Sequence, residues 1–141
     1  MNIAIGNDHA GVIYKKELIK YLEEKGHKLF DVGTDSEESC NYPIYAKKVC
    51  EKIINKECTF GILICGTGIG MSISANKVKG IRAACLQEEK SAKLSREHND
   101  ANIICMGSRI ISIEKAKEIV DGFLNATFQG GRHKERIDLI E

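Results

Sequence analysis

The strongest constraint on the fold is a regular alternation, along the whole chain, of short apolar runs and longer amphipathic segments. The apolar runs are predicted as strands at 2–7, 27–33, 59–65, 80–86 and 101–107. Segments with helical spacing of apolar residues follow at 12–26, 43–56, 70–78, 88–98 and 112–128. Strands that alternate with helices over short connections form βαβ units. The pattern therefore predicts an α/β fold with a largely parallel sheet covered on both faces.

Local signals mark where several of these helices begin and end. Gly26 is a C-terminal stop, Pro43 lies in a first turn where no N–H bond is lost, and Ser112 is an N-cap. The tail differs, because a Gly-Gly break at 130–131 precedes a basic segment that can form a helix. We expect one domain, 1–141, whose last residues, 128–141, form an arm that leaves the body and docks on a partner subunit.

Length and charge exclude several classes of function. The chain has 141 residues, of which 29% are charged, and its net charge is +1. A chain of this size can bury a substantial single core, and its charge balance favours neither nucleic acid nor an acidic membrane surface. Neither a signal-peptide pattern nor an apolar run of membrane-spanning length occurs in the sequence. We therefore expect a cytoplasmic protein without a nucleic-acid or membrane partner.

The six cysteines do not indicate a disulfide scaffold or a zinc site. Cys65, Cys85 and Cys105 lie in apolar, strand-like runs, where a free cysteine behaves as a small hydrophobic residue. No C-x-x-C pair is present for metal or redox chemistry. Buried or incidental thiols are the default interpretation for all of them except Cys65.

Cys65 ends an apolar run and is followed by the glycine-rich stretch CGTGIG. Ligands of open parallel sheets bind beyond the carboxyl ends of the strands, so this loop is a candidate site. Gly66, Gly68 and Gly70 do not fit a dinucleotide fingerprint, and the Gly-Lys-Ser/Thr ending of a phosphate-binding P-loop is missing. Converging N–H groups and a helix N-terminus could hold a phosphate or a developing oxyanion. A thiol beside them can act as base or nucleophile, although glycines after a strand are also common as plain tight turns.

Histidines and arginines add further candidates. Asp8 and His9 follow the first strand, whereas His98 closes the fourth helix, where it could simply interact favourably with the helix dipole. Arg132 and Arg136 are four residues apart, so one helical face carries both guanidinium groups. The pair is either an exposed basic surface or a phosphate clamp on a mobile arm.

These residues lie in motifs that resemble type B ribose-5-phosphate isomerases, a family that also includes allose- and galactose-6-phosphate isomerases. The segments NDHAG, DVGT, YP, ILICGTGIGMSISANK, GIRAA, SREHND and GGRHKER occur in the order and spacing of that family. The resemblance spans essentially the whole chain. It implies a Rossmann-like three-layer α/β/α sandwich with a five-stranded parallel sheet and no metal or organic cofactor. It also implies dimers or tetramers with sites at subunit interfaces.

The resemblance further implies roles for the matched residues in isomerising a phosphorylated sugar. Asp8 and His98 match the groups that open the sugar ring, and Cys65 matches the base that forms an enediolate. Thr67 could relay a proton between the two oxygens. The expected substrate-binding residues are His9, Tyr42, Gly66, Gly68, Ile69, Gly70, Asn99, Arg109, Arg132 and Arg136.

Three of these expectations leave alternatives open. Arg109 could face the phosphate or form a buried structural ion pair. Met71 occupies the position at which some members carry a glutamate, so the chain resembles the cysteine type. A six-carbon sugar phosphate, a flavodoxin-like binding module and a thiol redox protein are the rival functions.

Overall fold

The computed structural model describes residues 1–141 as five strands and six α-helices, with one short 3-10 helix at His9–Gly11. The strands are β1 Asn2–Asn7, β2 Lys28–Asp31, β3 Phe60–Cys65, β4 Ala83–Cys85 and β5 Ile103–Gly107. The helices are α1 Val12–Glu24, α2 Tyr42–Ile54, α3 Ile69–Ala75, α4 Glu89–Glu97, α5 Ile113–Leu124 and α6 Arg132–Ile137.

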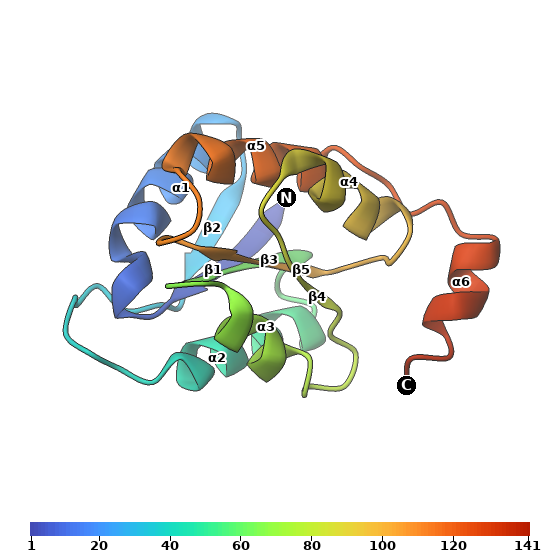
Figure 1. Cartoon of the computed structure of the whole chain (residues 1–141), viewed down its shortest axis with the longest axis horizontal. Coiled ribbons are helices and arrows are strands. Elements are labelled where there is room, and N and C mark those ends of the chain that lie inside the picture. Colours follow the sequence, from blue (N-terminus) through green and yellow to red (C-terminus); the bar gives the residue numbers. More distant parts are fainter.

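All neighbouring strands pair in parallel, in the order β2-β1-β3-β5-β4. Helices α1, α5 and α4 cover one face of the sheet, and α2 and α3 cover the other (Figure 1). This arrangement confirms the three-layer sandwich with a five-stranded parallel sheet. The direction of winding reverses between β1 and β3, and in such sheets the crevice at that point is the usual ligand site.

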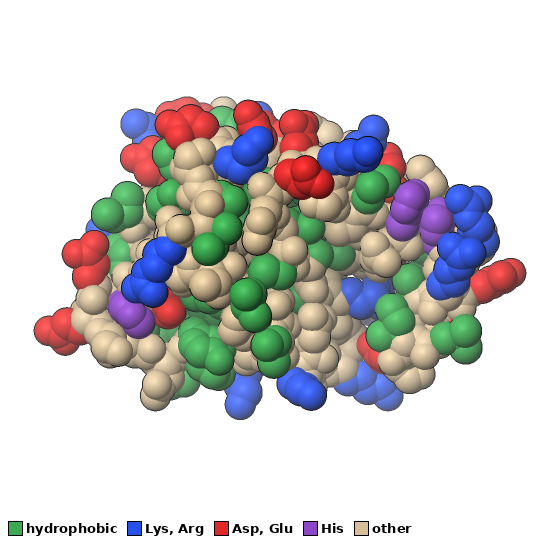
Figure 2. Space-filling view, viewed as in Figure 1, with side chains coloured by type: hydrophobic (Ala, Val, Ile, Leu, Met, Phe, Trp, Pro, Cys, Tyr) green, Lys and Arg blue, Asp and Glu red, His purple; other side chains and the backbone are tan.

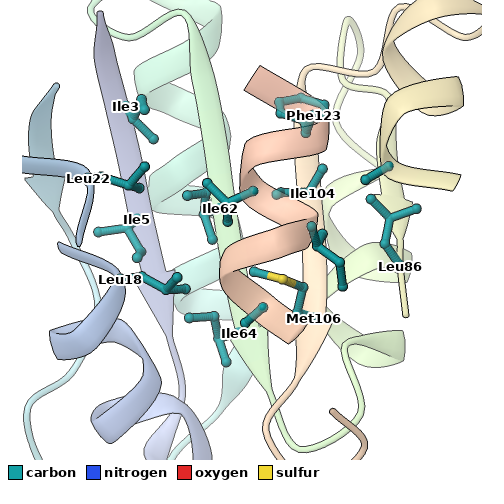
Figure 3. Close-up of a cluster of buried hydrophobic side chains, with 14 of the residues drawn as sticks. Ile3, Ile5, Leu18, Leu22, Ile62, Ile64, Leu86, Ile104, Met106 and Phe123 are labelled. Atoms are coloured by element: carbon teal, nitrogen blue, oxygen red, sulfur yellow. The ribbon is translucent and has the colours of Figure 1, made fainter. Parts of the chain in front are cut away.

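The core consists of two apolar layers, one on each face of the sheet. On the α1 and α5 face, Ile5 lies beside Ile62, and Ile62 beside Ile104, all of them nearly or fully buried (Figure 3). On the other face, Leu63 and Cys105 are paired in register and pack against α2 and α3. Because both faces of the central strands are covered, their sequences are apolar at almost every position instead of alternating.

The expected helix ends are found, whereas several element lengths differ from the expectation. The Ser112 side chain accepts a hydrogen bond from the Lys115 N–H, and Gly26 adopts a φ of +91° just beyond α1. The strand expected at 80–86 covers only Ala83–Cys85. Ala83 exchanges hydrogen bonds of 2.8 and 2.9 Å with the side chain of Asn76 instead of with a further strand. Cys85, expected inside an apolar strand, is exposed at the end of this edge strand.

The tail forms a short arm that stands away from the sheet at the end of the molecule near α4 (Figure 1). Gly130 and Gly131 have φ values of +69° and +57°, which explains the Gly-Gly break before α6. Two contacts join the arm to the body: the Gln129 N–H donates to Glu97 O, and the Gly80 N–H donates to the Glu141 carboxylate. None of the helices is long and apolar enough to cross a bilayer.

Candidate active site

The glycine loop between β3 and α3 brings backbone N–H groups to the sulfur of Cys65. The Gly68 N–H donates to Cys65 Sγ over 3.1 Å, and the side chain of Thr67 accepts from the Ile69 N–H over 3.2 Å. Gly68 adopts a φ of +81°, and a Cβ there would lie 2.9 Å from the backbone of Met106. The loop therefore needs glycine at 68, both for its backbone conformation and for its close approach to β5.

Two side chains cover the edges of this loop. The ring of Tyr42, at the start of α2, lies against Gly70, where an added Cβ would come within 2.6 Å of it. Arg109, just beyond β5, lies over Gly66, where an added Cβ would be 2.9 Å from the guanidinium. Arg109 is exposed and has no ion-pair partner. The alternative of a buried structural ion pair is therefore wrong.

Asp8 and His9 follow β1 and lie beside the end of β3, because the Asp8 N–H donates to Ile64 O. Asp8 is 6% exposed, and its carboxylate accepts from the Ala10 N–H over 2.9 Å, which caps the 3-10 helix. His9 Nδ1 lies 4.0 Å from the same carboxylate and accepts the Cys40 N–H over 3.3 Å. In the neutral ring, the proton of His9 is consequently on Nε2.

The remaining predicted residues gather elsewhere. His98 is the C-cap of α4, and its ring stacks on that of His133 with centroids 4.1 Å apart and planes at 11°. His98, Asn99, His133 and Arg136 line a cavity of about 420 Å³ together with Ile137 and Ile140. Arg132 and Arg136 are both exposed on α6. This second group is called the arm cluster below: His98, Asn99, Arg132, His133 and Arg136.

The glycine loop and the arm cluster lie at opposite edges of the sheet. Cys65 ends β3, whereas His98 precedes β5, and the register pairs Cys65 with Gly107 at the far end of that strand. Figure 2 shows two histidines and a group of basic side chains over α6 at one end of the molecule, and a single histidine at the other end. A single chain therefore does not bring His98, Asn99, Arg132 and Arg136 together with Cys65.

The other thiols differ from Cys65 in their surroundings. Burial raises the pKa of Cys50 to about 11 and the pKa of Cys105 well above its ordinary value. It also raises the pKa of the Cys58 and Cys85 thiols. These four thiols are protonated at neutral pH, which suits the structural role expected for them. Nowhere in the chain do three or more His, Cys, Asp or Glu side chains come together in a way that could hold a metal ion.

Three residues near the site have no obvious signal in the sequence. Cys40 contributes a backbone N–H, which any residue except proline would supply. Ser108 donates its hydroxyl to Ala10 O over 2.8 Å and so joins the end of β5 to the turn after β1. His133 lies within a basic run that is typical of a solvated helix, although its ring is buried.

Comparisons with known proteins agree with this geometry. The Ribose/Galactose Isomerase family matches residues 3–140. Ribose-5-phosphate isomerase B of Escherichia coli (strain K12) is 49% identical over 138 residues, which are 98% of this chain and 93% of that protein. The structure of ribose-5-phosphate isomerase B from Clostridium thermocellum has a TM-score of 0.98 at 48% identity, covering 99% of this chain and 95% of that chain. The Mycoplasma genitalium enzyme, solved with bound ribulose-5-phosphate, has a TM-score of 0.94 at 43% identity, covering 99% and 93%.

Proposed function

The chain belongs to the ribose/galactose isomerase family and is an isomerase, and we propose that it interconverts ribose 5-phosphate and ribulose 5-phosphate with Cys65 as the base. The observation that carries this proposal is the contact of 3.1 Å between the Gly68 N–H and Cys65 Sγ. A hydrogen bond donated to sulfur favours the thiolate, which is the form able to accept a proton.

The reaction begins with opening of the sugar ring. Asp8, with the partner subunit's His98, moves protons between the ring oxygen and the anomeric hydroxyl, which leaves an aldehyde at C1. The buried Asp8 carboxylate keeps a second oxygen free, because only one of its oxygens accepts the Ala10 N–H. Tyr42 and the partner subunit's Asn99 line the sugar.

Proton transfer between the two carbons follows. The Cys65 thiolate takes the proton from C2, and the electron pair of that bond moves through C1 onto its carbonyl oxygen to give an enediolate. N–H groups of the loop from Gly66 to Gly70 stabilise this oxyanion. The Thr67 hydroxyl moves a proton from the oxygen of C2 to that of C1, and the Cys65 thiol returns its proton to C1. The sequence of steps regenerates the thiolate and leaves the ketose.

We further propose that the complete site lies between two copies of the chain. In a two-fold dimer the arm cluster of each subunit reaches the glycine loop of the other. The phosphate is then held by Arg132 and Arg136 of one subunit and by His9 and Arg109 of the other. Exposed apolar side chains beside the glycine loop support this assembly, because Ile69 and Ile73 on α3 are 55% and 58% exposed.

Turnover measured in the presence of a chelator tests the reaction. We expect the wild-type protein to convert ribose 5-phosphate to ribulose 5-phosphate without added metal, and Cys65→Ala to bind the sugar phosphate while losing most turnover. Loss of wild-type activity on chelation would contradict this mechanism. Comparison with allose 6-phosphate distinguishes a five-carbon from a six-carbon substrate. A cytoplasmic location remains the expectation, since the substrates are water-soluble sugar phosphates.

A further inference from the structure

Lys15, on α1, carries a fully buried ammonium group that the isomerase mechanism does not use. Its Nζ donates to Thr34 O over 2.7 Å and to Asp35 Oδ1 over 2.6 Å, and it lies 3.3 Å from Asp31 Oδ2. The side chain is 0% exposed, whereas the carboxylates of Asp31 and Asp35 are 35% and 75% exposed. The lysine is thus buried against a segment that is itself largely in water.

That segment is the loop 32–41, which connects β2 to α2 without a helix or strand of its own. Its first half is attached to β1 through Asn7, whose side-chain amide donates to both Thr34 O and Asp8 O over 2.9 Å. A Cβ at Gly33 would overlap the Asn7 side chain, so the loop approaches β1 as closely as its backbone allows. Thr34 O therefore receives hydrogen bonds from both Lys15 and Asn7.

Between 36 and 39 the loop has only local contacts, with the Ser36 hydroxyl accepting from the Glu38 N–H. The loop next touches the body at Cys40, whose N–H donates to His9 Nδ1 over 3.3 Å. This contact determines which nitrogen of His9 carries the proton, and it leaves Nε2–H as the donor available to an anion. The position of the Cys40 N–H depends on where the preceding loop is held.

We propose that Lys15 is a positioning residue, whose buried ammonium holds the loop 32–41 so that the Cys40 N–H keeps His9 in its Nε2–H tautomer. The consequence for phosphate binding rests on the proposed function, in which His9 faces the phosphate. The electrostatics agree with a permanent contact. The Lys15 ammonium holds the pKa of the Asp35 carboxyl below its ordinary value, so that this partner is charged at neutral pH.

The substitution Lys15→Met separates positioning from folding. Methionine keeps an unbranched side chain of similar length on the buried face of α1, and both carboxylates left behind are exposed enough to be hydrated. The variant is expected to fold with the wild-type circular dichroism spectrum. Lys16→Met is the matched control, because it removes the same charge from the next residue, which is exposed and makes no hydrogen bond to the loop.

The experiment observes the His9 ring by nitrogen-15 NMR in the full-length protein, with its signals identified by comparison with His9→Gln. Wild type and Lys16→Met should show unprotonated Nδ1 and protonated Nε2, whereas Lys15→Met should show averaged shifts of two exchanging tautomers. The KM for ribose 5-phosphate should rise about tenfold in Lys15→Met with kcat changed less than about twofold, as for one lost hydrogen bond to a charged group.

The two readouts fail separately. An unchanged His9 tautomer in folded Lys15→Met overturns the positioning role, whatever the activity. A wild-type protein that shows the Nε2–H tautomer but does not isomerise ribose 5-phosphate overturns the proposed function and leaves the positioning role intact. A fall in kcat and a rise in KM that Lys16→Met shares would also contradict the inference, because the effect would then follow charge and not the buried contact.

Discussion

The rings of His98 and His133 lie face to face, with centroids 4.1 Å apart and planes at 11°. This contact joins the end of α4 to the arm, and it places the predicted ring-opening histidine beside the predicted phosphate clamp. The order of these groups around Arg136 is therefore fixed by packing within one subunit, before any partner is present. Two stacked imidazoles tolerate neutral rings better than charged ones, because two cations at this distance repel each other.

The stack makes docking of the arm sensitive to pH. Burial, followed by His98 and the two arginines of α6, lowers the pKa of His133 from its ordinary value of 6.5. The undocked arm therefore takes up a proton first, and docking weakens as the pH falls from about 6.5 through the lowered pKa of docked His133. Above 6.5 both states are neutral, and docking no longer depends on this group.

Hydrogen exchange of the α6 backbone amides between pH 5 and 8, corrected for intrinsic rates, measures this effect. Protection should fall on acidification in the wild-type protein and should change much less in His133→Gln. His27, whose pKa is also lowered by burial, lies in the turn after α1 and provides the same background in both proteins. Equal pH profiles for the two proteins would show that His133 does not control docking.

Cys65→Ser tests the sulfur as base with the smallest possible change in shape. A serine hydroxyl is a far weaker acid than a thiol, so the variant has almost no ionised base at neutral pH. We expect kcat to fall by about 10²- to 10⁴-fold, the usual contribution of a general base. Cys85→Ser is the matched control, since its thiol contacts Thr67 O at 3.9 Å but lies outside the proposed chemistry, and it should keep wild-type turnover. Equal losses in both variants would argue against Cys65 as the base.

The division of the site between subunits predicts a specific pattern of complementation. In a mixed dimer of Cys65→Ala and Arg136→Ala, one site combines both substitutions and the other combines two native halves. Random pairing of two inactive variants should therefore restore about a quarter of wild-type activity.

A second mixture provides the control for that pattern. His98→Ala with Arg136→Ala places both substitutions in the arm cluster, so every site contains one of them and activity should stay at the level of the single variants. Restoration in this second mixture, or its absence in the first, would be incompatible with sites shared between the glycine loop and the arm cluster.

The fold could be predicted from sequence because its elements are local. Apolar runs such as 59–65 are covered on both faces, and Ser112 and Gly26 act within one helical turn of their own positions. The strand order could not be predicted, because periodicity reports which side of a strand is covered and not which strand lies beside it. The short β4 has the same cause, since an edge strand has only one neighbour.

The candidate site could be predicted as a set of residues but not as an arrangement. Motif resemblance identified His98 and Cys65 together without indicating that they belong to opposite edges of one sheet. Lys15 reads as one more charged residue of an amphipathic helix, and its burial depends on a loop that begins sixteen positions later in the chain and is irregular. Contacts made by irregular segments leave no periodic pattern that a sequence could reveal.

Gly68 and Gly26 together separate the chemical role of the glycine loop from the backbone strain of a left-handed residue. Both have positive φ, at +81° and +91°, but only Gly68 has no room for a Cβ, whereas nothing lies within 4 Å of one at Gly26. Gly26→Ala should lower the free energy of unfolding by about 1–2 kcal/mol, the cost of a left-handed non-glycine residue, and leave kcat unchanged. Gly68→Ala should add a displacement of the loop against β5, which moves its N–H away from Cys65 Sγ and lowers kcat by about 10²-fold. Denaturant unfolding and steady-state turnover on the two variants make the comparison, and a Gly68→Ala protein that loses only stability would remove the loop from the proposed chemistry.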